Sequence, residues 1–229
     1  MRIVRKILTR LIGDKRAVAM TEFALATPFV LMVGLYGIET ANMALVHMRV
    51  SQAAMQIADN GSRIGDTATL QNRKIYESDI NDLLYGAHLH SGESLDLFEH
   101  GRVIVSSLHS KTDKPKEQFI SWQRCIGKKS WASSYGDEGD GVSTKMHGMG
   151  PGKEQVSAPK DGALIFVELA YEYQPLFTDA FMDSKTMQVY SAFIVRDDRD
   201  LSQIYQRDPG DPDYVADCSS NNGVASVSS

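Results

Sequence analysis

The sequence has only two cysteines, Cys125 and Cys218, and only seven prolines among its 229 residues. It contains no cysteine motif of the kind that holds a structural metal ion. It also lacks a Gly-x-Ser-x-Gly elbow, a Walker-type phosphate loop and a dinucleotide-binding fingerprint. The sequence signals of common hydrolases, nucleotide-dependent enzymes and dinucleotide-dependent enzymes are therefore missing.

Basic residues are scarce after the first 16 positions. Residues 1–16 hold six basic residues and one acid, and the remaining 213 residues hold 18 basic and 28 acidic residues. The formal net charge of −5 is thus the sum of +5 in residues 1–16 and −10 in the remaining residues. An acidic body has no positive field for phosphate groups, so binding of nucleic acid is excluded. This asymmetric distribution of charge is typical of a protein that is inserted in a membrane with a fixed orientation.

One long apolar run follows the basic segment. Residues 23–38 contain no charge, and the run extends from Val18 to Ala44 with only Glu22 and Glu39 as interruptions. A bilayer span needs about 20 mostly apolar residues, so we predict a transmembrane half-helix at about 20–44. Positive charge before it predicts a cytoplasmic N-terminus and an exported body. The competing interpretations are a cleaved secretory signal, which lacks a convincing cleavage site here, and a buried core helix.

The apolar pattern continues past the span with helical spacing. One predicted helix face consists of Met43, His47, Val50, Ala54, Ile57, Gly61 and Ile64. Because no proline or turn cluster intervenes, we predict one helix over residues 18–65, with its second half packed on a folded body. Pro28, Gly34 and Gly37 are the expected places for a bend. Glu22 requires an explanation, since a carboxylate at the start of an apolar run must be hydrated, neutralised or paired.

Residues 66–229 are expected to form one exported α+β domain. A second helix is predicted over residues 74–89, ended by Gly92. Two strand pairs are predicted as hairpins from runs rich in β-branched and aromatic residues, at 102–108 with 118–126 and at 163–173 with 186–196. Four antiparallel strands on the second half of the long helix make an α+β roll.

Two further segments of the body have little apolar periodicity. Residues 127–162 contain eight of the 18 glycines and are predicted to be a loop insertion, either with a partner contact or without a task. The serine-rich residues 219–229 are expected to be disordered.

The N-terminal motif resembles a known family. The run KRAVAMTEFAL at residues 15–25, followed by Pro28 and an apolar stretch, is similar to the N-terminus of type IV pilin-like proteins. It resembles most closely the TadE-like minor pseudopilins of the tight-adherence (Tad/Flp) pilus, with the TadF-like class as the alternative. In that family a leader ends in a small residue, and Glu-Phe follows at the fifth and sixth mature positions. Ala17 and Val18 then flank the processing site, which gives Glu22 and Phe23 those two positions.

The resemblance implies a function in assembly. It implies a minor pseudopilin without catalytic activity or cofactor, in the bacterial inner membrane, with a periplasmic body of pilin-like fold. Its implied partners are other minor pseudopilins, the major pilin, the prepilin peptidase, the assembly platform and membrane lipid. Glu22 would compensate the mature N-terminal amine of a neighbour. Ala17 departs from the family, which normally has Gly there, so the leader is either cleaved or retained.

The strands of the body also resemble this family. The strand runs at 166–177 and 192–196 are similar to the paired strands that close TadE-like domains.

The sequence also fits two other interpretations. A signal-anchored exported enzyme or ligand-binding protein, unrelated to pili, is the alternative, and an uncleaved envelope scaffold is a third. The longer TadG-like members carry a metal-dependent adhesion domain, whose Asp-x-Ser-x-Ser signature this sequence lacks.

The cysteines and histidines lead to separate predictions. Cys125 ends a predicted strand and Cys218 lies near the C-terminus; in an oxidising compartment we predict a disulfide between them, with free thiols as the alternative. His88 and His90 form a His-x-His pair without the further ligands that a metal site needs, so no metal is predicted.

Overall fold

The computed structural model describes residues 15–65, 73–92, 94–177, 185–196 and 199–219, with side chains from residue 18 onward. Most of the predicted leader and nearly all of the predicted disordered tail lie outside these residues. The chain divides into two units: the residues up to Ala44 with Pro175–Asp183, and Leu45–Gln174 with the rest. One helix, α2, contributes residues to both units.

Helix α2 (Lys15–Gly61) confirms the predicted single long helix. It continues without interruption through Pro28, Gly34 and Gly37, where the sequence indicated a bend. The predicted end at residue 65 is wrong, because the chain turns immediately after Gly61. The Ile64 N–H still bonds to the Asn60 carbonyl, but Gly65 adopts a positive φ of 138°.

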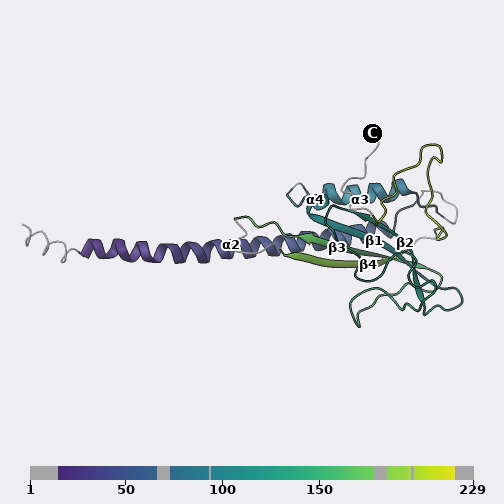
Figure 1. Ribbon diagram of the computed structural model, residues 1–229, viewed down its shortest axis with the longest axis horizontal. Coiled ribbons are helices and arrows are strands. Elements are labelled where there is room, and N and C mark those ends of the chain that lie inside the picture. Colours follow the sequence, from purple (N-terminus) through teal and green to yellow (C-terminus); the bar gives the residue numbers. More distant parts are fainter. Residues whose placement is uncertain (1–14, 66–72, 93, 178–184, 197–198, 220–229) are drawn as a thin grey trace, which may run out of the picture. The chain divides into compact units, whose positions relative to one another are not determined.

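Four strands form one antiparallel sheet in the order β2-β1-β3-β4, so the α+β prediction is confirmed (Figure 1). Both predicted hairpins exist, since β1 pairs with β2 and β3 pairs with β4. The central pair β1·β3 joins the hairpins. The strands are β1 (Gly101–Ser110), β2 (Gln118–Ile126), β3 (Ala163–Glu172) and β4 (Thr186–Ile194).

The second half of α2 is buried against one face of this sheet. Small residues on its inner face bring the helix backbone close to the strands. The buried helix residues are Val50, Ala53, Ala54, Ile57 and Ala58, and they share a cluster with Val103, Val105, Ile165, Val167 and Leu169. The predicted stripe is buried from Val50 to Gly61, whereas His47, one turn earlier on the same face, is exposed.

Helix α3 (Glu77–Ser91) adds Ile80, Leu84 and Ala87 to the same core and ends at Gly92 as predicted. Its predicted start at residue 74 is wrong, because the chain before it is held in extended pairing: the Tyr205 N–H bonds to the Ile75 carbonyl. The short helix α4 (Leu97–His100) leads directly into β1.

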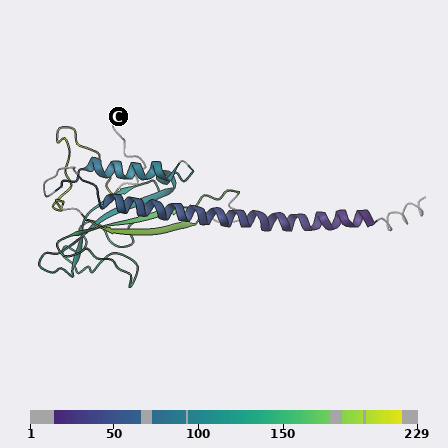
Figure 2. The same ribbon diagram turned by 180° about the vertical axis from the view of Figure 1, so that it is seen from behind.

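The insertion of residues 127–162 covers the opposite face of the sheet (Figures 1 and 2). It contains no helix or ladder strand, yet Met149 and Ala158 pack with Leu108, Leu164 and Phe166 in a second core cluster. With both faces covered, nine of the ten residues of β1 and of β3 are buried. The insertion therefore has a structural task, which its sequence pattern did not indicate.

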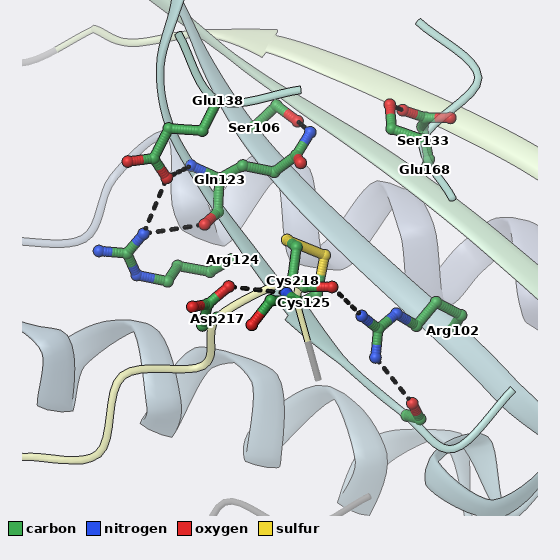
Figure 3. Close-up of a disulfide and its surroundings, with 12 residues drawn as sticks. Arg102, Ser106, Gln123, Arg124, Cys125, Ser133, Glu138, Glu168, Asp217 and Cys218 are labelled. Carbon is green, nitrogen blue, oxygen red and sulfur yellow. Dashed lines mark hydrogen bonds and ion pairs between the residues drawn. A yellow bond between two sulfur atoms is a disulfide. The ribbon is translucent and has the colours of Figure 1, made fainter. Parts of the chain in front are cut away.

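Glu168 ties the insertion to the middle of the sheet. Its carboxylate accepts hydrogen bonds from the Ser133 hydroxyl and the Ser134 backbone N–H (Figure 3). Burial raises the pKa of Glu168, and these two hydrogen bonds oppose the rise. At the edge strand, the Ile120 N–H bonds to the Asp140 carbonyl, so the insertion also covers the backbone of β2.

The C-terminal segment returns to β2, where Cys125 and Cys218 form the predicted disulfide (Figure 3). Beside it, the Cys125 N–H bonds to the Ala216 carbonyl. The buried Arg102 donates to the carbonyls of Gly127 and Cys218. The disulfide spans 93 residues of sequence, and closing a loop of that length is worth about 4 to 5 kcal/mol in the chain-entropy model.

His109 is a buried titratable group on β1. Its Nε2 lies 2.9 Å from the Ser107 hydroxyl, and its ring packs edge-on against Phe119. Burial lowers the pKa of His109 from 6.5 to about 4, and the positive charge of Arg199 adds to this effect. The imidazole is neutral in the folded protein at pH 7.

This depressed pKa predicts a loss of stability in mild acid. The unfolded chain binds a proton at His109 below about pH 6.5 and the folded chain only below about pH 4, so stability falls as the pH falls between these values. The expected contribution is about 3 kcal/mol. Urea unfolding of the detergent-solubilised chain at pH 7 and pH 4.5 measures it. His109→Gln should remove this part of the acid loss, whereas His90→Gln, at an exposed histidine, should leave it. An unchanged loss in His109→Gln would contradict the assignment.

Candidate functional site

The first half of α2 presents apolar side chains on all sides. An 18-residue stretch of this helix has a mean hydropathy of 1.8, and none of its residues is buried. The helix is therefore long and apolar enough to be a membrane anchor or a signal sequence. A surface of this kind is unstable in water and requires lipid or protein around it. Its large exposed side chains include Val18, Met20, Phe23, Leu25, Phe29, Val30, Leu31, Met32, Val33, Tyr36 and Ile38.

Glu22 and Phe23, the predicted assembly residues, are both exposed on this surface. They lie in continuous helix, where the neighbouring Thr21 hydroxyl bonds to the Val18 carbonyl. The peptide between Ala17 and Val18, the predicted processing site, is likewise helical, and the Ala17 side chain lies outside the described residues. Glu22 is therefore a carboxylate available to a neighbouring molecule.

Pro28, Gly34 and Gly37 follow along the same helix. Pro28 has no N–H for the Ala24 carbonyl four residues earlier, and the Thr27 hydroxyl donates to the neighbouring Phe23 carbonyl at 2.6 Å. A Cβ added at Gly34 or Gly37 would meet no atom within 4 Å. The two glycines thus leave open backbone surface, which is what close packing of a second helix requires.

Glu39 belongs to the candidate site, and the sequence pattern did not reveal its role. It is 0% exposed, although it lies on an otherwise exposed apolar helix. Its carboxylate accepts hydrogen bonds from the backbone N–H groups of Leu176 and Phe177, at 3.1 to 3.4 Å. These residues follow β3 and belong to the same unit as the first half of α2.

Ion pairs in the body join secondary structure elements. Arg124 on β2 makes a two-pronged contact with Glu77 at the start of α3, with one N–O distance of 2.6 Å, and also pairs with Glu138 of the insertion. Both partners of the Arg124–Glu77 pair are mostly buried, whereas Glu138 is 53% exposed. A buried two-pronged pair of this kind holds elements in register. Their geometry indicates a structural role.

A cavity of about 400 Å³ lies between α2 and α3. Its polar lining includes Asn60, Asp82 and His90, and the described residues that line it include no Ser, Thr, Cys or Lys to act as a nucleophile. In the part of the chain that the structure describes, no three His, Cys, Asp or Glu side chains converge as a metal site would require. The His88 ring of the His-x-His pair stacks on Phe98.

Comparisons of the chain with models of protein families, with curated proteins and with solved structures found no match.

The glycines of α2 differ in their surroundings, since Gly34 has open space around it and Gly61 is packed against the body. This difference leads to a prediction. Gly34→Leu should leave the stability of the body unchanged, because the added side chain enters open space. Gly61→Leu should destabilise the body by about 1 to 3 kcal/mol, since a Cβ there already lies 3.3 Å from Ile165 and Leu83. Urea unfolding of both variants, followed by the tryptophan fluorescence of the body, measures the difference. Equal destabilisation would show that Gly34 is packed within the folded chain.

Proposed function

We propose that this protein is a minor pseudopilin of a tight-adherence type pilus, anchored in the bacterial inner membrane and acting by helix packing with other pilins. The observation that carries the proposal is the division of α2. Its first half is an exposed apolar helix with Glu22 near its start, and its second half is the core helix of a sheet domain. A helix that folds one domain and exposes a second apolar surface is suited to joining that domain to other helices in lipid.

The chemistry of Glu22 supports this function. A carboxylate within an apolar helix surface is costly in hydrocarbon unless it meets a positive charge. The N-terminal amine that cleavage creates on a neighbouring subunit supplies that charge. Since an ion pair in a low dielectric strongly favours the register that forms it, Glu22 would fix how far one subunit is displaced along another.

The charge distribution supports the orientation. Six basic residues among the first 16 favour a cytoplasmic N-terminus, so the disulfide-bonded body would be periplasmic, where disulfides form. The proposed partners are the prepilin peptidase, other minor pseudopilins, the major pilin and the assembly platform. The proposed role is non-enzymatic.

The proposal predicts an effect of Ala17 on processing. We expect the peptidase to cleave between Ala17 and Val18, and Ala17→Gly to raise the cleaved fraction because it removes a methyl group where the family has none. Intact-mass analysis of the purified membrane protein from cells that carry the peptidase measures this fraction. The parent chain without peptidase is the control. Cleavage at the far end of the apolar segment would instead support an ordinary secretory signal and contradict the proposal.

The proposal also predicts a charge requirement at Glu22. Glu22→Gln should lower co-purification with the other minor pseudopilins at least tenfold, which corresponds to about 1.4 kcal/mol. Glu22→Asp, which keeps the charge, should retain most of the binding. Resistance to carbonate extraction checks that each variant is still inserted in the membrane. Unchanged co-assembly of Glu22→Gln would overturn the assigned role.

A further inference from the structure

The segment that follows β3 carries apolar side chains that are not covered. Leu176 is 58% exposed and Phe177 is 42% exposed, although their backbone N–H groups are held by the Glu39 carboxylate. The segment is thus fixed to α2 through its backbone, while its side chains remain available. An arrangement of this kind presents an apolar surface beside the helix.

The position of Glu39 on α2 defines where this surface lies along the apolar span. Residues 18–38 make a helix of about 30 Å, which matches the hydrocarbon thickness of a bilayer. Glu39 immediately follows this length. Tyr36, one turn earlier, is 53% exposed, and tyrosine is enriched where a span leaves the hydrocarbon. Glu39 and the bound segment therefore belong at the outer boundary of the span.

The burial of Glu39 explains how the segment is held there. A carboxylate at the edge of hydrocarbon requires hydrogen-bond donors, and free backbone N–H groups at the same depth require acceptors. Each satisfies the other at Glu39. The polar groups of the contact face inward and the apolar side chains are left outside.

We propose that residues 175–177 form a second membrane contact, in which Leu176 and Phe177 insert into the outer interfacial layer of the lipid bilayer beside α2 and Glu39 anchors them. This inference rests on the membrane-spanning part of the proposed function and adds a lipid-binding site on the body side of the span. Lipid is the occupant that fits, because the exposed surface of Leu176 and Phe177 lies in the same unit as the apolar half of α2.

The test measures depth in a membrane by spin labelling. Leu176→Cys in the full chain takes a nitroxide, and Cys125 and Cys218 do not react because they form a disulfide. The chain is placed at low density in vesicles of phosphatidylethanolamine and phosphatidylglycerol. Collision rates are measured with oxygen, which concentrates in lipid, and with a water-soluble nickel chelate. Val142→Cys is the matched control, since Val142 is an apolar residue of the insertion with 59% exposure.

We expect the oxygen-to-nickel collision ratio at position 176 to be several-fold higher than at position 142. Equal ratios would overturn the proposal. So would shielding of position 176 that appears only as the protein-to-lipid ratio rises, because that result indicates contact with a second protein. Flotation of the vesicles shows separately whether the chain is anchored in the membrane. If the chain floats with the vesicles but position 176 lies in water, the second membrane contact is wrong and the membrane span of the proposed function is not affected.

The anchoring role of Glu39 is tested in the same vesicles. Glu39→Ala removes the acceptor, and the ratio at position 176 should fall to the value at position 142. Glu39→Gln keeps one acceptor oxygen and should give an intermediate ratio. Retention of the disulfide and of the far-ultraviolet circular dichroism shows that each variant is folded. An unchanged ratio in folded Glu39→Ala would overturn the role of Glu39.

Discussion

The packing of the second half of α2 against the sheet is the interaction on which the rest of the body depends. The small residues Ala53, Ala54 and Ala58 allow the helix to approach the strands, and Val50 and Ile57 fill the space between them. This contact covers one face of β1 and β3, whose other face carries the apolar residues Leu108, Leu164 and Phe166. A second cover is then required, and the insertion supplies it. The disulfide and the Arg124 pairs hold the remaining segments to these layers.

Much of the body could be predicted from local sequence. The strands could be found because β-branched and aromatic runs such as the one in β3 are bounded by polar turns, and their observed ends lie within two residues of the predicted ones. The disulfide could be predicted because a chain that is expected to be exported and has two cysteines has one possible pair. The end of α2 at Gly61 and the late start of α3 were missed because backbone contacts with distant residues, such as Ile75 with Tyr205, decide them.

The insertion and Glu39 could not be predicted for a different reason. Residues 127–162 have no period because they cover the sheet with irregular backbone, and Met149 and Ala158 become core residues only through tertiary contacts. Glu39 accepts hydrogen bonds from backbone N–H groups 137 and 138 residues away, and an N–H group has no sequence signature. Sequence reasoning identifies side chains that carry chemistry more readily than it identifies the backbone groups that satisfy them.

The two acids of the apolar helix illustrate this difference and bear on how the chain acts. Both Glu22 and Glu39 interrupt the same apolar run, and local composition alone treats them alike. Glu39 is satisfied within the chain, so its burial needs no partner molecule. Glu22 is exposed on an apolar surface, and a bilayer that covers the surface leaves the carboxylate to be satisfied from outside the chain. Glu22 therefore fits the proposed intermolecular contact, whereas Glu39 makes its contact within the chain.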